Sequence, residues 1–355
     1  MKVLIEGSIF LHQHFGGISK YIYKLNKNLN KQSIKSKIFS PVSISQYLNK
    51  KEKNIFSFLR MKKIPKFTRK LFFLINNILT IIYIFFYKPD IVHFSYYNNF
   101  LAKFLINSYV LTVYDLIHEK KKYNNDFFNK KKVIDNAKHI ICISNQTKSD
   151  LKKFYNVSDN KISVISLGVD TVTKKKTKRH KFILFVGSRE RYKNFNNLIK
   201  AFSRSSFLKK NYQIICFGGG NFSKYEDKKF NKLKISSNIY YKFGDDNELK
   251  KHYKKASLFI TISTAEGFGL TPYEAISNGC PVVCSNIPVF KENLNGGCKF
   301  VNPLDINEIK SGIEKVLKDK TENAQNIKKG LKIIKNFTWK KTASETVRLY
   351  KKINL

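Results

Sequence analysis

The fold is decided by the stretch STAEGFGLTPYEAISNGCPVV, residues 263–283. It follows an apolar run at 258–262 that predicts a buried strand. Next come a loop with two glycines and the segment Thr271-Pro272-Tyr273-Glu274, which has the form of a helix start with Thr271 at the N-cap. The helix ends at Gly279 and another strand follows. The stretch therefore predicts one strand-loop-helix-strand unit of an open α/β sheet.

A ligand site is expected in the loop of this unit. Glu266 falls just past the carboxyl end of the first strand, where open α/β sheets bind ligands. The helix beyond the loop has free backbone N–H groups at its start, and these attract phosphate. Glu274 has two alternatives, because a capping box with Thr271 explains it as well as a ligand does. The capping box explains neither Glu266 nor the glycines Gly267 and Gly269.

The string EGFGLTPYEA carries two glutamates separated by seven residues and resembles the E-x7-E signature of the family 4 retaining glycosyltransferases. That family adopts the two-domain GT-B fold. The resemblance implies that Glu266 bonds hydroxyls of the donor sugar and that Glu274 bonds the ribose of the nucleotide. The amides between them would meet the sugar and the diphosphate, so the implied donor-binding segment is Gly267, Phe268, Gly269, Leu270 and Thr271.

The loop GSRERYKN, residues 187–194, follows the first strand of a second βα pattern. The resemblance implies that an Arg and a Lys in this loop hold the donor diphosphate, and Lys193 matches the Lys. The usual Arg position holds Ser188, so either Arg189 or Arg191 must substitute. Arg can fork onto two phosphate oxygens, whereas Lys acts as a point charge. A solvated basic loop is the alternative.

Gly16 and Gly17 stand where a helix is expected to begin, because apolar residues recur at helical spacing from Ile18 to Leu29. A glycine-rich loop between a strand and a helix is a weak signal for a phosphate cradle, and an ordinary βα turn is the alternative. The resemblance implies that this pair is the GG loop of the acceptor-side domain, close to the donor diphosphate.

A further strand, residues 109–115, ends in Tyr114-Asp115, and His118 follows three residues later. Members of the family usually carry His-Asp at this strand end, with the His near the reacting centre. The resemblance therefore implies acceptor-side catalytic roles for Asp115 and His118. It leaves open whether Tyr114 or His118 takes the role of the usual His, and a structural histidine is the alternative.

Residues 60–70 are strongly basic, and residues 71–87 are nearly all apolar. This run predicts one of three things: a buried domain helix, a transmembrane helix at the lower limit of length, or a helix at the membrane interface with basic flanks on anionic lipid. Lipid-linked acceptors are common in the family, which favours the interface. The expected location is cytoplasmic, with peripheral association at the inner face of the cell membrane.

Composition favours a folded, two-domain protein, because 355 residues are too many for one core and 42% of them are hydrophobic. The formal net charge of +42 indicates attraction to anions, namely nucleotide sugars, anionic lipid head groups or nucleic acid. A bias towards Lys, Asn and Ile along the whole chain is the compositional alternative. The lysines are spread out, so charge alone does not choose among these partners.

Cofactor and metal chemistry is not expected. The five cysteines form no CxxC pair and no zinc pattern, and they predict reduced, buried thiols in a cytosolic protein. Asp245-Asp246 is better explained as a helix N-cap before Glu248 than as a metal site. The resemblance implies that the donor diphosphate binds without a required metal. The start MKVLIEG predicts a first strand and not a signal peptide, because no long apolar region follows.

The expected fold is α/β of the GT-B type, with two Rossmann-like domains facing each other across a cleft. They are an acceptor-side domain at 1–170, a nucleotide-sugar-binding domain at 171–335, and a C-terminal helix at 336–355 that crosses back to the first domain. The resemblance implies retaining transfer of a hexose from a nucleotide sugar to a hydroxyl of a glycan or lipid-linked acceptor in cell-surface polysaccharide synthesis. Similarity to bacterial mannosyltransferase-like enzymes makes GDP-mannose the first donor to try.

Two other classes compete with this interpretation. A nucleotide-sugar 2-epimerase shares the fold, although its pattern lacks the E-x7-E loop, and it would turn over donor without an acceptor. A nucleic-acid-binding protein is suggested by the charge, but the sequence carries no helix-turn-helix, zinc or RNA-binding motif. A steep, salt-dependent affinity for duplex DNA would favour that class.

Overall fold

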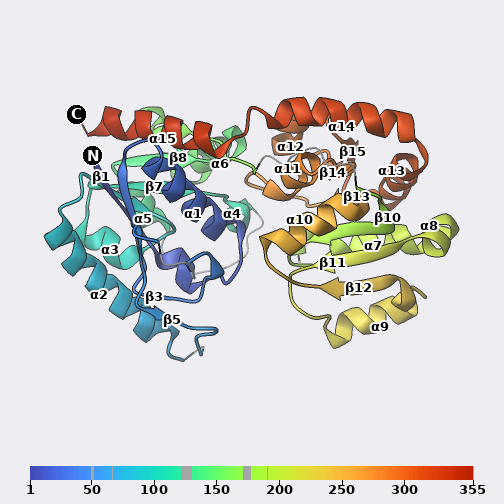
Figure 1. The fold of residues 1–355 in the computed structure, drawn as a ribbon, viewed down its shortest axis with the longest axis horizontal. Coiled ribbons are helices and arrows are strands. Elements are labelled where there is room, and N and C mark those ends of the chain that lie inside the picture. The colour runs from blue at the N-terminus through green and yellow to red at the C-terminus, as the bar shows by residue number, and fades with distance from the viewer. Residues whose placement is uncertain (49–51, 66, 121–129, 171–176, 190, 355) are drawn as a thin grey trace. The chain divides into compact units, whose positions relative to one another are not determined.

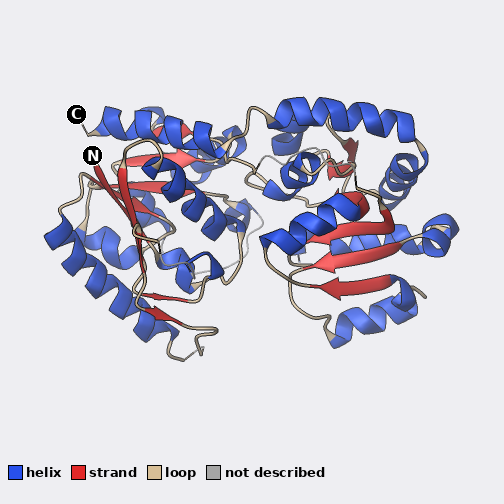
Figure 2. Cartoon of the chain, in the orientation of Figure 1, coloured by secondary structure: helices blue, strands red, loops and turns tan. Residues whose placement is uncertain are grey.

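The computed structural model describes residues 1–48, 52–65, 67–120, 130–170, 177–189 and 191–354. The chain divides into two compact units, unit 1 being Met1–Gly168 with Trp339–Leu355 and unit 2 being Val169–Thr338. Both units are built of strands and helices in alternation (Figures 1 and 2). The sequence predicts boundaries after residues 170 and 335, within two or three residues of these breaks. The predicted linker lies partly outside the described residues, at 171–176.

Unit 1 contains a sheet of seven parallel strands in the order β4-β2-β1-β6-β7-β8-β9. Their bounds are Ile55–Phe56, Lys35–Phe39, Lys2–Glu6, Ile91–Phe94, Tyr109–Val113, His139–Cys142 and Ile162–Val164. The unit also contains the small sheet of β3 (Val42–Ser43) and β5 (Leu59–Arg60), and the helices α1 (Gly17–Asn30), α2 (Arg69–Tyr87), α3 (Asn99–Phe104), α4 (Ile117–Lys120), α5 (Lys130–Asp135) and α6 (Asn145–Tyr155). The central strands are apolar and buried, as expected for parallel strands covered by helices.

The last helix, α15 (Trp339–Ile353), belongs to unit 1 and packs against α1 (Figure 1). Its Tyr350 hydroxyl lies 2.5 Å from Nδ1 of the buried His93, whose Nε2 lies 2.7 Å from the Thr112 hydroxyl. Burial lowers the pKa of His93 to about 3, so the ring is neutral near neutral pH. The predicted return of the C-terminal helix to the first domain is confirmed.

Helix α2 has its polar residues inside and its apolar residues outside. Asn76, Asn77 and Thr80 are its buried residues, whereas most of its Leu, Ile and Phe side chains are wholly or partly exposed. By length and composition alone the helix is long and apolar enough to cross a membrane, and little of it is buried. Of the three alternatives for residues 71–87, the buried domain helix is therefore excluded, and the interfacial and transmembrane alternatives remain.

Unit 2 contains a sheet of six parallel strands in the order β12-β11-β10-β13-β14-β15. Their bounds are Ile239–Lys242, Gln213–Phe217, His180–Val186, Ala256–Thr261, Val282–Ser285 and Lys299–Val301. The helices of this unit are α7 (Phe195–Ser203), α8 (Ser206–Asn211), α9 (Lys224–Lys232), α10 (Asp246–Lys255), α11 (Leu270–Ser277), α12 (Pro288–Leu294), α13 (Ile306–Lys318) and α14 (Lys320–Ile334). The predicted strand-loop-helix-strand unit is thus formed by β13, α11 and β14.

The strand order reverses between β10 and β13, which are neighbours in the sheet although β11 and β12 separate them in sequence. Such a reversal is a topological switch point, and the loops that leave its two strands diverge to opposite faces and leave a crevice for a ligand. In unit 2 these loops are residues 187–194 and 262–269. They are the two loops that the sequence predicts to bind the donor.

Candidate functional site

The two loops at the switch point of unit 2 are joined by an ion pair and by a backbone hydrogen bond. Nζ of Lys193 lies 2.7 Å from Oε1 of Glu266, and the two side chains are 21% and 9% exposed. The backbone N–H of Thr264 donates to the carbonyl oxygen of Tyr192 over 2.8 Å. A cation and a carboxylate from separate strands are thereby held side by side at the carboxyl edge of the sheet.

The N-terminus of α11 follows directly after Glu266. Gly269 is its N-cap residue and has φ +72°, in the left-handed region that glycine adopts without strain. A Cβ at this position would also lie 2.5 Å from the ring of Phe290, so only glycine fits. Because the N-cap residue Gly269 has no side chain, the backbone N–H groups of the first turn of α11 are suited to hold an anion.

The predicted capping box is wrong, because Thr271 lies within α11 and is not its N-cap. Glu274 is therefore not part of a capping box with Thr271. Its Oε2 accepts a hydrogen bond of 3.2 Å from the hydroxyl of Tyr253 on α10. Tyr253 is fully buried, and its pKa is raised well above the usual value, first by burial and then by the Glu274 charge. Tyr253 thus positions the Glu274 carboxylate, a role that the sequence does not predict.

The side chain of Phe268 packs into the unit and is 2% exposed. Its ring stacks on that of Tyr273 at 4.5 Å and meets the ring of Phe337 edge-on. Of the predicted donor-binding segment, Phe268 can therefore offer only its backbone. Gly267 is buried as well, whereas Leu270 and Thr271 are half-buried at the start of α11.

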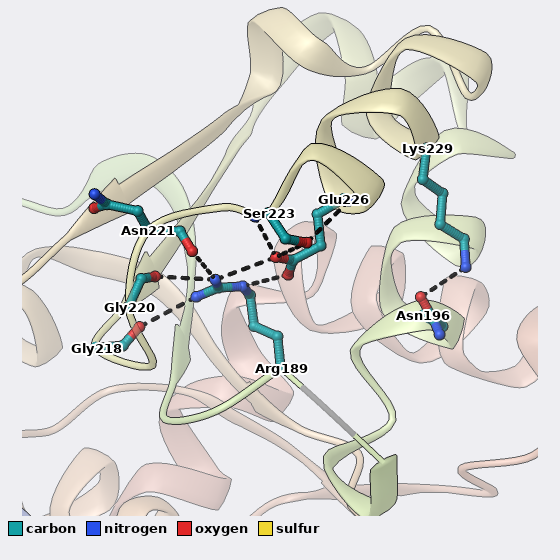
Figure 3. Close-up of polar contacts among 8 residues, drawn as sticks. All are labelled: Arg189, Asn196, Gly218, Gly220, Asn221, Ser223, Glu226 and Lys229. Atoms are coloured by element: carbon teal, nitrogen blue, oxygen red, sulfur yellow. Dashed lines mark hydrogen bonds and ion pairs between the residues drawn. The ribbon is translucent and has the colours of Figure 1, made fainter. Parts of the chain in front are cut away.

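Arg189 is buried and bound to its own unit (Figure 3). Its guanidinium donates to the carbonyl oxygens of Gly218, Gly220 and Asn221 at 2.9–3.2 Å and forms an ion pair of 2.6 Å with Glu226. The same Glu226 completes a capping box with Ser223 at the start of α9. The geometry thus gives Arg189 the role of fixing the glycine turn after β11.

Ser188 and Arg191 are the exposed residues beside Arg189 that the sequence also predicts to contact the donor. Arg191 begins the short 3-10 turn Arg191–Lys193 and has φ +48°. Arg191 and Lys193 are thus the first and last residues of one short turn. Residue 190 lies outside the described residues.

The acceptor-side residues all lie in unit 1. Gly16 is the N-cap residue of α1, and Gly17 is the first residue of that helix, as predicted. The amide oxygen of Gln13 accepts hydrogen bonds from the backbone N–H and the hydroxyl of Ser19 in the first turn, each 3.2 Å long. A Cβ on Gly16 would meet the amide end of this Gln13 side chain, which would have to shift to make room.

Tyr114, Asp115 and His118 follow β7. The Tyr114 hydroxyl donates to the carbonyl oxygen of Ser95 over 3.0 Å, and its side chain is buried. Asp115 accepts a 3.1 Å hydrogen bond from the backbone N–H of Ile117 at the start of α4, and His118 lies half-buried on that helix. Of the two candidates for the role of the family's His, Tyr114 is thus buried and bonded to its own unit, whereas His118 is half-buried.

A buried polar cluster at the switch point of unit 1, between β1 and β6, was not predicted. Oε1 of Glu6 accepts hydrogen bonds from the backbone of Ser8 at 2.7 Å and from the Asn98 side chain at 3.0 Å. Burial raises the pKa of Glu6 to about 7. The signal in the sequence is an acidic residue at the end of an apolar strand, directly before Gly7. Among the described residues, no group of three or more His, Cys, Asp and Glu side chains is placed to hold a metal ion.

Comparison with solved structures agrees with this architecture. Sucrose-phosphate synthase from Thermosynechococcus elongatus has a TM-score of 0.80 at 16% identity, and the alignment covers 99% of this chain and 98% of that one. HepE from Anabaena, solved with UDP and glucose, has a TM-score of 0.75 at 12% identity, with coverage of 99% and 100%. Two parallel-sheet, Rossmann-like units with a returning C-terminal helix define the GT-B class, so the predicted fold class is confirmed.

The family follows from the sequence comparisons. Residues 15–173 match the model of Glycosyltransferase Family 4, and residues 170–333 match that of Glycosyl transferases group 1. The chain belongs to this family of glycosyltransferases, as the sequence predicts.

Two curated relatives are O-antigen mannosyltransferases. The O-antigen chain mannosyltransferase RfbU of Salmonella typhimurium is 31% identical over 222 residues, which is 60% of this chain and 62% of that protein. The O-antigen chain mannosyltransferase B of Escherichia coli is 25% identical over 237 residues, 61% of each chain. The matches thus span about three fifths of the length of these relatives.

Proposed function

We propose that the protein moves a hexose from a nucleotide sugar to a hydroxyl of a glycan or lipid-linked acceptor, with retention at the anomeric carbon, during synthesis of a cell-surface polysaccharide. The observation that carries this proposal is the Lys193–Glu266 pair at the switch point of unit 2, directly before the N-terminus of α11, whose N-cap residue is Gly269. An ammonium group and a helix N-terminus suit a diphosphate, and a carboxylate suits the hydroxyls of a sugar.

In this proposal the bond between the anomeric carbon and the diphosphate oxygen breaks, and the acceptor oxygen bonds to the same face of that carbon. The acceptor proton passes to the leaving diphosphate, so no strong side-chain base is required. Lys193, Arg191 and the start of α11 stabilise the charge that develops on the diphosphate. Glu266 binds the sugar and Glu274 binds the ribose, while His118 and Asp115 contact the acceptor.

GDP-mannose is the proposed donor, because two of the relatives are mannosyltransferases of O-antigen synthesis. UDP-sugars are the competitors, since UDP occurs in solved structures of the same fold. We also propose a cytoplasmic location, because all five cysteines are free and buried, which suits a reducing compartment.

The test is a thermal-shift panel of GDP- and UDP-sugars, with Lys193→Ala as the matched variant. A ligand at ~100 times its dissociation constant stabilises the folded protein by about 2.7 kcal/mol. For a unit of this size that corresponds to a rise in Tm of roughly 5–11 °C. GDP-mannose should give this shift, and Lys193→Ala should reduce it.

The proposal fails if no nucleotide sugar raises the Tm of the wild-type protein. It also fails if the protein converts a nucleotide sugar to its 2-epimer in the absence of any acceptor, because that is the activity of the competing class. A larger shift with a UDP-sugar than with GDP-mannose would retain the transfer activity and overturn the proposed donor.

A further inference from the structure

We propose that helix α2 docks this protein on the surface of an anionic lipid bilayer, with its exposed apolar stripe in the boundary between head groups and acyl chains. The stripe repeats at positions i, i+3, i+7, i+11 and i+14, a spacing that places its members on one side of a helix. Its members are Leu71, Leu74, Ile78, Ile82 and Phe85, and Phe86 extends it at the C-terminal end. Phe85 and Phe86 are 72% and 77% exposed.

The opposite side of α2 is fixed to unit 1 by buried hydrogen bonds. The Asn76 side chain accepts from the backbone N–H of Val42 over 2.8 Å and donates to its carbonyl oxygen over 2.9 Å. The Asn98 amide donates to the side-chain oxygen of Asn77 over 2.7 Å. Turning the stripe inward would break these bonds and leave the backbone groups of Val42 and the Asn98 amide buried without these partners, which is costly. The stripe therefore faces outward as part of the fold.

More apolar side chains extend this surface beyond the helix. The ring of Phe56 on β4 stacks on Tyr83 of α2 with centroids 5.5 Å apart, and the Phe58 ring meets Phe56 edge-on at 4.4 Å. Phe58 is 68% exposed, and Phe67, just before α2, is 86% exposed. Exposed aromatic rings beside an apolar helical face are typical of segments that enter a membrane interface.

The charge around the stripe identifies the partner as anionic lipid. No acidic residue occurs between Glu52 and Asp90, a stretch that includes all of α2. The basic residues of this stretch that the structure shows as exposed are Lys53, Arg60, Lys62, Lys63, Arg69, Lys70 and Lys88. Basic side chains flanking an apolar face complement the negative surface potential of a bilayer that contains anionic lipid.

A helix lying on the surface fits the contacts of α2 better than a helix spanning the bilayer. Spanning would place Asn76, Asn77 and Thr80 in hydrocarbon and would break their bonds to Val42 and Asn98. Surface docking keeps these bonds and buries only the stripe. A spanning arrangement is therefore an outcome that the experiment must distinguish.

The experiment is flotation of the whole protein with phosphatidylcholine vesicles that do or do not contain phosphatidylglycerol. We expect binding that requires phosphatidylglycerol and weakens in high salt. The double variant Phe85→Ser with Phe86→Ser should lose most of the binding. Lys62→Gln and Lys63→Gln should each lower affinity about fivefold, the equivalent of ~1 kcal/mol per basic residue.

Unit 2 supplies the matched controls. Phe243 is as exposed as Phe86, at 77%, and Lys228 and Lys232 are exposed on α9. Phe243→Ser, Lys228→Gln and Lys232→Gln remove the same chemistry from another surface and should leave binding unchanged. Equal losses in both sets would show that the high net charge binds vesicles without a specific face, and would overturn the proposal.

A second readout tests insertion at one position. All five native cysteines are buried, so a thiol-reactive, polarity-sensitive dye should label Phe86→Cys selectively, with Phe243→Cys as its control. Only the dye at position 86 should shift its fluorescence emission to shorter wavelength when phosphatidylglycerol vesicles are added.

The proposal is overturned if the wild-type protein does not bind these vesicles at low salt. It is also overturned if bound protein resists release by high salt and alkaline carbonate, as a protein with a spanning helix does. None of these assays uses a nucleotide sugar, so their failure is distinct from failure of the proposed transfer.

Discussion

Arg189 and Arg191 lie two residues apart in one loop, but Arg189 is buried and bound to its own unit, whereas Arg191 is exposed. Arg189→Ala deletes the guanidinium that binds three carbonyl oxygens of the glycine turn and the carboxylate of Glu226. A hydrogen bond to a charged group contributes ~1.5–3 kcal/mol, and water at this half-exposed turn replaces part of the loss. We expect the free energy of unfolding of unit 2 to fall by about 2–4 kcal/mol, which lowers Tm by roughly 4–16 °C.

Arg191 is exposed, so its removal should leave stability almost unchanged. Arg191→Asn suits the test because Asn tolerates the left-handed backbone found there, with φ +48°. The free energy of unfolding should change by less than ~0.5 kcal/mol. The affinity for GDP should fall roughly ten- to a hundredfold, because one charge-assisted contact to the diphosphate is lost.

Scanning calorimetry measures the stability of both variants, and titration calorimetry with GDP, well below either Tm, measures their affinity. Arg189→Ala should bind GDP nearly as well as the wild-type protein at that temperature. If Arg189→Ala keeps the wild-type Tm and loses GDP binding while Arg191→Asn keeps GDP binding, the roles assigned to the two arginines are reversed.

Three further predictions concern other parts of the chain. Glu266→Ala should bind free GDP nearly normally and transfer sugar roughly ten- to a few hundredfold more slowly. Glu274→Gln should bind GDP more weakly. The reverse pattern of GDP affinities would contradict the assignment of the sugar to Glu266 and of the ribose to Glu274. His118→Ala should lower turnover and leave nucleotide-sugar affinity unchanged in a binding titration, and equal losses of affinity and stability would instead indicate a structural histidine. The unfolding free energy should contain a contribution that falls by up to ~3 kcal/mol between pH about 4.5 and about 7, because the folded state keeps a proton on Glu6 that the unfolded chain releases. Glu6→Gln should abolish that contribution, measured by denaturant titration at each pH. His93, with its pKa lowered to about 3, makes stability change with pH in the opposite direction, but it does so in both proteins and cancels in their difference. Identical pH profiles of stability in the two proteins would exclude the raised pKa of Glu6.

The sequence predicts those features of the site that depend only on neighbouring residues in the chain. The positions of Glu266 and Lys193 just past strand ends follow from apolar runs and glycine-bearing loops. Their contact depends on the strand order β10-β13, which pairs segments more than seventy residues apart. Only the resemblance to the family indicated that these loops share a ligand, because periodicity says nothing about which strands become neighbours.

Two errors have physical reasons of their own. Thr271 has the side chain of a good N-cap, but Gly269 adopts a left-handed backbone that starts the helix two residues earlier. Residues 71–87 are so uniformly apolar that they carry little periodic signal, and the usual rule would turn Asn76 and Asn77 towards water. Their partners, Val42 and Asn98, lie 21–34 residues away, so the sequence gives no sign that these amides are buried.

The role of Arg189 could not be read from its own loop either. Its acceptors lie 29–37 residues further along the chain, in a turn that reaches it only because β10 pairs with β11. Local sequence shows three candidate cations between 189 and 193 and does not distinguish them. The fold separates them by burying one and leaving Arg191 exposed.

The return of α15 to unit 1 has a consequence for the order in which the protein is made. Unit 2 is one continuous stretch, Val169–Thr338, so all of it is synthesised before Tyr350 is added. Unit 1, whose strands are translated first, has to wait for its last helix before His93 gains the Tyr350 hydroxyl as a partner. Domains generally fold as units during synthesis, N-terminal first, but here the later-translated unit is the first whose chain is complete. Until α15 arrives, the nascent unit 1 exposes the part of α1 that this helix later covers.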